Sequence, residues 1–444
     1  MHQRPIGIDL FAGAGGMSLG FEQAGFDVAA AVEIDPVHCA VHKFNFPHCA
    51  ILPRSVVGLT GQEIRLAAGI GTRTVHVVFG GAPCQGFSLI GQRLLDDPRN
   101  RLVGEFLRIV QELQAQYFVF ENVKGLTLGP HRAFLEEFIA HANGIGYDVR
   151  LPWKVLDAAH YGTPQHRERL ILFGARRGLN LPDYPEKQTN AADRRGRVHL
   201  GLPVGPTAAD ALADLPDAEH FDSLLTTDEV STSSWGDPSP YAAELRCLTN
   251  EAWGYGYVRH WNPQLLTSSA RTDHTEISRR RFRETRPGQV EPVSRFYKLS
   301  GIGLSNTLRA GTDGARGAFT SPRPIHYRFD RCVTVREMAR LHGFPDWFRF
   351  NETKWHGARQ IGNSVPPPLA RAIADAVIAA LAIVPSRPFE TIDLGDKSLL
   401  RYTLSRAADH FGIPTPPSKR DRKSGAVKRK QHEIEEARLL RMGT

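Results

Sequence analysis

The sequence predicts an α/β fold in which a doubly wound, mostly parallel sheet is followed by a smaller, irregular domain. Three observations indicate it. Within residues 1–177, short apolar runs alternate with helical patterns, which is typical of parallel strands with helices on both faces. From Gly178 the composition changes to Pro, Gly, Asp and Arg with short strand-like pieces. A chain of 444 residues also exceeds one typical core, so two domains are expected.

Five apolar runs are the predicted strands of the first domain. In chain order they read IGIDLF, VAAAVEID, VHVVFGG, YFVFENV and RLILFGA. Between them we expect helices over 18–24, 36–44 and 102–114. Because ligands bind at the carboxyl ends of the strands in such sheets, the site residues should stand next to the ends of these runs.

Residues 178–329 are predicted to form the second domain, rich in loops. Helical patterns return in TVREMARLHGFPDW and VPPPLARAIADAVIAALAIV, where apolar residues recur every three or four positions. Residues 330–384 should therefore pack back on the first domain. Residues 385–444 are a C-terminal extension ending in a proline-rich, basic tail. We expect that tail to be disordered with a short terminal helix, and non-specific nucleic-acid affinity is the alternative.

Composition narrows the classes of function. A formal charge of +8 suggests a polyanionic partner, and arginines gather between Arg259 and Arg340, notably in SRRRFRETR; a solvated basic surface is the alternative. No apolar stretch approaches the length of a bilayer span and no signal peptide pattern opens the chain, so we expect a cytoplasmic, nucleoid-associated protein without membrane contact. Five cysteines without a CxxC pair argue against a disulfide framework and the usual zinc site, so no metal is expected.

The stretch DLFAGAGGMSLGF combines a strand end, a glycine-rich turn and a helix start, so backbone N–H groups can approach a ligand closely. A dinucleotide fingerprint would place a third glycine after Gly13 and Gly15, but Ser18 stands there, which disfavours a pyrophosphate ligand. The next strand ends at Glu33, whose carboxylate can accept hydrogen bonds from both ribose hydroxyls. Adenosine without pyrophosphate indicates S-adenosylmethionine, with a dinucleotide or a purely structural turn as the alternatives.

One cysteine, Cys84, stands in a Pro-Cys-Gln turn after the third apolar run, where exposure offers its side chain more than packing does. The other four cysteines have settings typical of small buried or partly buried side chains: Cys39, Cys49, Cys247 and Cys332. Cys84 is therefore the candidate nucleophile.

Charged side chains occupy neighbouring strand ends. Glu121 follows the run YFVF, and Arg167 and Arg169 lie where the last run begins. A glutamate that ends an apolar strand costs free energy unless it is paired or used. Together these groups indicate methylation at carbon 5 of cytosine: Cys84 adds to carbon 6, Glu121 activates ring nitrogen 3, and Arg169 stabilises charge at the 2-oxygen. The base must leave the duplex stack, and the loop after Cys84 could close over it.

The chain resembles the bacterial DNA (cytosine-5-)-methyltransferases. The resemblance runs from Ile6 to Ile383 through motifs in the family's order: DLFAGAGGMSLGFEQAGF, VEID, GGAPCQGFS, ENVKG, QHRER, TVREMARLHGFPD and QIGNSVPPPLA. It implies a Rossmann-like S-adenosylmethionine-dependent methyltransferase fold whose residues 178–329 form a target-recognition domain for double-stranded DNA. The cofactor residues that it implies are Phe11, Gly13, Gly15, Glu33 and Asn363. The catalytic positions that it matches are Cys84, Glu121, Arg167 and Arg169.

One position departs from the family's pattern. In LPRSVVGLTG, Ser55 stands where relatives usually carry an acidic residue that contacts the adenine amino group. A serine can still accept a hydrogen bond, so we expect at most weaker cofactor binding.

Three other functions remain open from the sequence. A cytosine-5 RNA methyltransferase would use the same chemistry, but its relatives have little recognition domain, whereas about 150 residues are inserted here. A catalytically silent DNA-binding protein would not need the intact catalytic set. A dinucleotide oxidoreductase is disfavoured by the broken glycine fingerprint.

The resemblance also suggests partners. Arginines can read guanine edges and neutralise phosphates, so contacts with DNA are predicted for Ser88, Gln92, Arg93, Arg281 and Arg283. No nuclease or helicase motif is evident, so we expect a monomeric modification enzyme of a restriction-modification or related phage-defence system. A cognate restriction endonuclease, if there is one, would be a separate chain.

Overall fold

The computed structural model describes residues 4–83, 101–129, 131–191, 201–312 and 322–416. The first part of the chain forms an eight-stranded sheet in the order β3-β2-β1-β4-β5-β8-β6, with β7 also paired to β8. Its strands are β1 (Ile6–Leu10), β2 (Asp27–Val32), β3 (Ala50–Leu52), β4 (Val77–Gly80), β5 (Tyr117–Val123), β6 (Tyr147–Val149), β7 (Lys154–Asp157) and β8 (Glu168–Arg176). All five predicted strands are present.

The direction of β8 brings the two ends of the predicted site together. Strands β1 to β5 run parallel, whereas β8 runs antiparallel to β5, with Val123 opposite Arg169. The start of an antiparallel strand lies at the same sheet edge as the ends of its parallel neighbours. Residues that precede or open β8 therefore meet residues that close β1, β2, β4 and β5.

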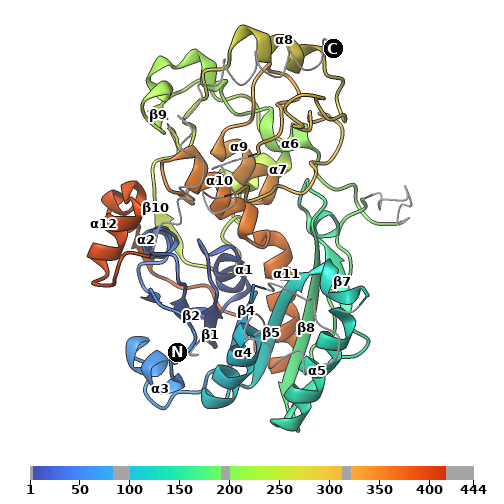
Figure 1. Cartoon of the computed structure of the whole chain (residues 1–444), viewed down its shortest axis with the longest axis vertical. Helices are drawn as coiled ribbons and strands as arrows, with labels where there is room; N and C mark the ends of the chain where they lie inside the picture. The colour runs from blue at the N-terminus through green and yellow to red at the C-terminus, as the bar shows by residue number, and fades with distance from the viewer. Residues whose placement is uncertain (1–3, 84–100, 130, 192–200, 313–321, 417–444) are drawn as a thin grey trace, which may run out of the picture.

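Helices cover both faces of this sheet. On one face lie α3 (Gly61–Ala67), α4 (Arg101–Glu112) and α5 (His131–Gly144), and on the other lie α1 (Gly16–Ala24) and α11 (Pro367–Leu381). The predicted helices over 18–24, 36–44 and 102–114 correspond to α1, α2 (Pro36–Asn45) and α4. Within residues 330–384, α11 lies against α1 and the sheet (Figure 1).

The second domain consists of short elements and long connections. Its helices and strands are α6 (Ala208–Leu212), α7 (Pro240–Leu245), α8 (Glu276–Glu284), β9 (Val230–Ser231), β10 (Val258–His260) and β11 (Leu265–Leu266). The part with α8 and β9 lies at the end of the molecule opposite the sheet, with α9 (Val335–His342) and α10 (Lys354–Asn363) between the two (Figure 1). In contrast, β10 lies beside α2, and its Arg259 pairs with Glu22 of α1.

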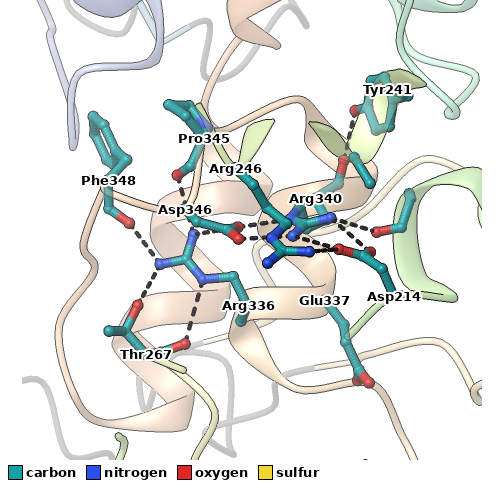
Figure 2. A network of polar contacts seen from close by, with 12 residues as sticks. Asp214, Tyr241, Arg246, Thr267, Arg336, Glu337, Arg340, Pro345, Asp346 and Phe348 are labelled. Atoms are coloured by element: carbon teal, nitrogen blue, oxygen red, sulfur yellow. Dashed lines mark hydrogen bonds and ion pairs between the residues drawn. The ribbon is translucent and has the colours of Figure 1, made fainter. Parts of the chain in front are cut away.

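A buried network of charges on α9 holds this domain in place (Figure 2). The guanidinium of Arg340 is fully buried and donates to Asp346 at 2.6 and 2.7 Å and to Asp214 at 3.1 Å. Burial alone would lower the pKa of Arg340, but Asp346 and Asp214 raise it above its ordinary value. Arg336, also buried, donates to Thr267 Oγ1 at 2.6 Å. Because Asp214 and Thr267 come from separate parts of the second domain, α9 ties those parts together.

The C-terminal extension is partly built into the fold. Its strand β12 (Thr391–Asp393) pairs in parallel with β10, and its helix α12 (Leu404–His410) packs on α2. The basic tail beyond 416 lies outside the described residues.

One stretch of the described chain, Lys354–Leu381, is long and apolar enough to cross a membrane. It consists of α10 and α11 in succession, and more than half of it is buried inside the fold. Burial of this kind is typical of core helices in globular proteins.

Candidate active site

A cavity of about 670 Å³ opens at the carboxyl ends of β1, β2, β4 and β5. It holds the glycine loop at one end and charged side chains at the other. Among the predicted site residues, those that line it are Phe11, Gly13, Glu33, Glu121, Arg167, Arg169 and Asn363. Segments more than 350 residues apart in the chain thus meet in one hollow.

The glycine loop is held by the carboxylate that follows β2. Glu33 accepts hydrogen bonds from the backbone N–H groups of Gly13 and Asp35, both at 2.8 Å. Phe11 and Gly13 adopt positive φ angles of 65° and 57°, which turn the chain back toward Glu33. Ile34, next along, also lines the cavity and is 64% exposed. An apolar surface beside Phe11 and a carboxylate fit an adenine ring and its ribose.

Two predicted cofactor positions have other roles in the structure. Gly15 is not among the residues lining the cavity; a Cβ there would come within 2.4 Å of the Phe46 ring, so packing requires the glycine. Ser55 does not line the cavity either, and its Oγ accepts a hydrogen bond from the Val57 N–H at 3.1 Å. The Ser55 side chain therefore stabilises the turn at residues 55–57.

The other end of the cavity is built around one ion pair. Arg169 Nε lies 2.7 Å from Glu121 Oε1, and both side chains are only 13% exposed. Gly81 makes room for this pair, because a Cβ there would meet Glu121 Oε2 at 2.3 Å. The carboxylate and the guanidinium are thus held side by side on β5 and β8, facing the cavity.

Arg167 differs from Arg169 in its surroundings. It is 1% exposed, and its guanidinium donates to the carbonyl oxygens of Leu308 at 3.0 Å and Gly362 at 2.8 Å. Burial, and then the neighbouring Arg169, hold the pKa of Arg167 well below its usual range, although Glu121 acts in the opposite direction. Arg167 therefore joins Leu308 and Gly362 to the cavity wall, and its predicted catalytic role stays a prediction.

The predicted nucleophile Cys84 lies outside the described residues, as do Ser88, Gln92 and Arg93. The described chain stops at Pro83, which lines the cavity together with Ala82. Asn122, beside Glu121, donates from Nδ2 to the Ala82 carbonyl at 3.0 Å. The approach to Cys84 is thus fastened to the end of β5. The remaining cysteines are buried or partly buried, as predicted.

Asn363 enters the cavity from the C-terminal segment, at the end of α10. The next residue, Ser364, bonds from Oγ to His342 Nε2 at 3.1 Å, and His342 Nδ1 lies 2.9 Å from Gln165 Nε2. Burial holds the pKa of His342 well below its usual range, so a neutral ring connects these groups.

Sequence reasoning missed one buried carboxyl in the cavity wall. Asp9, on β1, is 1% exposed and accepts a hydrogen bond from Ser18 Oγ at 2.6 Å; Ser18 Oγ also lies 3.0 Å from His42 Nε2. The pKa of Asp9 is raised to about 8, mainly because the carboxyl is buried. The hydrogen bond from Ser18 lowers this pKa, and the nearby charge of Glu33 raises it. An acidic residue inside the apolar run IGIDLF was the signal that could have revealed it.

The two predicted arginine contacts on α8 lie far from this cavity, at the end of the molecule opposite the sheet (Figure 1). Arg281 is mostly buried and lies 3.8 Å from Glu291. Arg283 is exposed and pairs with Asp330 at 2.7 Å. The structure does not bring these residues to the catalytic groups, and their contact with DNA stays a prediction.

Comparison with known proteins gives a consistent result. The model of the family "C-5 cytosine-specific DNA methylase" matches residues 7–379. The chain is 58% identical over 410 residues to the Type II methyltransferase M.XorII of Xanthomonas oryzae, covering 92% of this chain and 93% of that one. It is 31% identical to the Type II methyltransferase M.AgeI of Thalassovita gelatinovora, covering 84% and 99%.

Solved structures agree on the fold. An E. coli protein described as a DNA modification methyltransferase encoded within a prophage superposes with a TM-score of 0.66 at 30% identity, covering 85% of this chain and all of that one. S. pombe Dnmt2 methyltransferase, at 16% identity, has a TM-score of 0.52 over 86% of this chain and supports the fold alone. With the glycine loop, Glu33 and the Glu121–Arg169 pair in one cavity, the match establishes that the chain belongs to the C-5 cytosine-specific DNA methylase family, enzymes whose methyl donor is S-adenosylmethionine.

Proposed function

We propose that this enzyme methylates carbon 5 of a cytosine flipped out of a short duplex sequence, through a covalent bond between Cys84 and carbon 6. The observation that carries the proposal is the Glu121–Arg169 ion pair, which shares one cavity with the glycine loop. Cys84 directly follows Pro83, which lines the same cavity. Glu121 and Arg169 therefore share one cavity with the residues proposed to hold the cofactor.

The reaction follows from these groups. The Cys84 thiolate forms a bond to carbon 6, and the electrons of the 5,6 double bond move to carbon 5. Glu121 hydrogen bonds to or protonates ring nitrogen 3, while Arg169 stabilises negative charge at the 2-oxygen. Carbon 5 then takes the methyl group as the bond between that methyl group and the donor sulfur breaks, and the electron pair of that bond stays on the sulfur. Loss of the carbon 5 proton to water or a base reforms the double bond and releases the thiolate.

Bound S-adenosylmethionine would supply an electrophilic methyl group on a sulfonium. Phe11 and Ile34 would contact its adenine, Glu33 its ribose, and Asn363 would close the site from the C-terminal segment. Phe11 follows β1, and Glu33 and Ile34 follow β2, whereas Glu121 and Arg169 belong to β5 and β8. This chain's part is to orient the donor and exclude water around the reacting carbon.

The biological role proposed here is modification of host DNA in a restriction-modification or phage-defence system. The Type II names of the relatives support it. The enzyme would act as a monomer on DNA in the bacterial cytoplasm, with any nuclease on a separate chain.

The test is to express the chain, its Cys84→Ser form and a Cys247→Ser control in a methylation-deficient host and sequence the genome after bisulfite conversion. Cytosines protected in one short context by the parent and the Cys247→Ser control, but not by Cys84→Ser, are expected. Duplexes with 5-fluorocytosine at the target should trap a covalent complex, because carbon 5 then has no proton to lose. Protection that survives Cys84→Ser would overturn the assignment, and methylated RNA without methylated DNA would change the substrate.

A further inference from the structure

A segment of the second domain is fastened directly to the turn that carries Arg167. Residues 305–308 run alongside residues 164–167. Two backbone hydrogen bonds join the segments: Ser305 N–H donates to Pro164 O at 2.8 Å, and His166 N–H donates to Ser305 O at 3.1 Å. Three more bonds involve side chains. Thr307 Oγ1 donates to His166 O at 2.7 Å, Leu308 N–H donates to Gln165 Oε1 at 3.0 Å, and Arg167 Nη1 donates to Leu308 O at 3.0 Å. Both segments contribute backbone groups and side chains to these hydrogen bonds, so the position of one segment relative to the other is well fixed.

The segment leaves two polar side chains facing outward. Ser305 and Leu308 are buried, whereas Asn306 and Arg309 are exposed. The backbone of Arg309 is held close to α10, because a Cβ on Gly362 would lie 2.4 Å from its carbonyl carbon. Arg309 is thus an exposed cation beside the residues that close the active site.

A second exposed arginine shares a groove with them. Arg295, Asn306 and Arg309 line a hollow of about 240 Å³, together with Tyr297. Within the described parts of the chain, neither Arg295 nor Arg309 has an ion pair or a side-chain hydrogen bond. Arg281 and Arg283 of α8 differ, because each has an acidic neighbour in its own domain. Two unpaired cations in a polar groove fit a polyanion. Leu308, which also lines the groove, accepts a hydrogen bond from Arg167 of the catalytic turn.

We propose that Arg295, Asn306 and Arg309 read base edges of the target DNA in the major groove beside the flipped cytosine. The guanidinium groups would bind O6 and N7 of guanines, and the Asn306 amide would bind N6 and N7 of an adenine. The bonds between residues 305–308 and the catalytic turn then set the distance from the bases read to the base methylated. This inference rests on the proposed function and names the part of the DNA that the enzyme selects.

The experiment measures methylation of a duplex library with randomised bases around the target cytosine, for the parent chain, Arg309→Ala, Arg309→Lys and Arg280→Ala. Arg280 is an exposed arginine on α8 and controls for loss of charge. Arg309→Ala should lower the preference for guanine at one position about 10- to 100-fold, Arg309→Lys should keep part of it, and Arg280→Ala should leave it unchanged. Arg295→Ala should do the same at a different position.

A uniform fall in methylation with unchanged base preference would overturn the inference, since it indicates a phosphate contact. If Arg309→Ala is inactive, the ratio of Kd values for target and single-substituted duplexes is measured in the Cys84→Ser background. An unchanged ratio overturns the inference, and a ratio closer to one supports it. Absence of cytosine methylation by the parent chain on the whole library would instead reject the proposed function.

Discussion

At the scale of single residues, catalysis depends on how Glu121 and Arg169 are held. Both are largely withdrawn from solvent and paired at 2.7 Å, so each orients the other before the base arrives. Glu121→Gln should lower kcat for methyl transfer about 10²- to 10⁴-fold, because the amide cannot protonate ring nitrogen 3. Affinity for S-adenosylhomocysteine should be unchanged. The control is Glu168→Gln, a change in the residue next to Arg169 in the chain. It removes an ion pair with Lys124 and should leave activity intact. A loss below 10-fold for Glu121→Gln would exclude it as the acid.

Asp9 provides a second prediction at this scale. Its pKa of about 8 in the folded protein lies above that of an unfolded aspartate, so folding favours its protonated form. The stability from this group is complete below the unfolded pKa near 3.8 and is lost as pH rises toward 8. Asp9→Asn should therefore gain stability over the parent chain progressively from pH 4 to 8, at up to about 1.4 kcal/mol per pH unit. Urea unfolding at several pH values measures the difference, and a gain that does not vary with pH would contradict it.

At the scale of elements, close packing of α1 on α11 fixes the glycine loop that begins α1. A Cβ on Gly20 would lie 2.4 Å from the Cβ of Ala370, so Gly20→Ala should force the two helices apart and cost about 1–3 kcal/mol of unfolding free energy. Gly104 in α4 is the matched control, because nothing described lies within 4 Å of a Cβ there. Gly104→Ala should stabilise by about 0.5–1 kcal/mol through helix propensity. Chemical denaturation compares the two, and equal effects would be evidence against the packing argument.

Elements also show what the sequence can predict. Apolar runs identified five strands, and glycine, glutamate and arginine at their ends identified the lining of the cavity, because strand periodicity and ligand position are local rules. The antiparallel direction of β8, the burial of Arg167 and the pairing of residues 305–308 with residues 164–167 depend on contacts between distant segments. Arg281 and Arg283 were chosen for their charge, and charge alone does not say which arginines face the site.

At the scale of the whole molecule, the relation between sheet and second domain depends on buried charge. The arginines of α9 bind carboxylates and backbone carbonyls from several segments. Because the helices and strands of the second domain are short, these ion pairs and hydrogen bonds set its orientation. Buried ion pairs give little net stability over apolar packing, and we infer that this network serves to fix the geometry of the second domain. A fixed geometry of this kind would hold the residues proposed to read DNA at a set distance from the catalytic groups.

Removing one carboxylate from this network should therefore be costly. Asp346→Asn removes one of the two carboxylates drawn beside the buried Arg340 and leaves Asp214 (Figure 2). The change should lower the unfolding free energy by about 3–5 kcal/mol. Glu136→Gln, which breaks an exposed pair with Arg132, is the matched control and should cost less than about 1 kcal/mol.

Acid should act like Asp346→Asn. Burial raises the pKa of Asp346, but Arg340 lowers it by more, so the pKa lies below its usual range. The stability from Asp346 is then present above the unfolded pKa and lost as pH falls through the folded pKa, so the Asp346→Asn penalty should shrink in acid. Guanidinium unfolding of both variants at neutral and acidic pH decides the matter, and a penalty that is small at neutral pH would mean that the second domain is held by its apolar contacts instead.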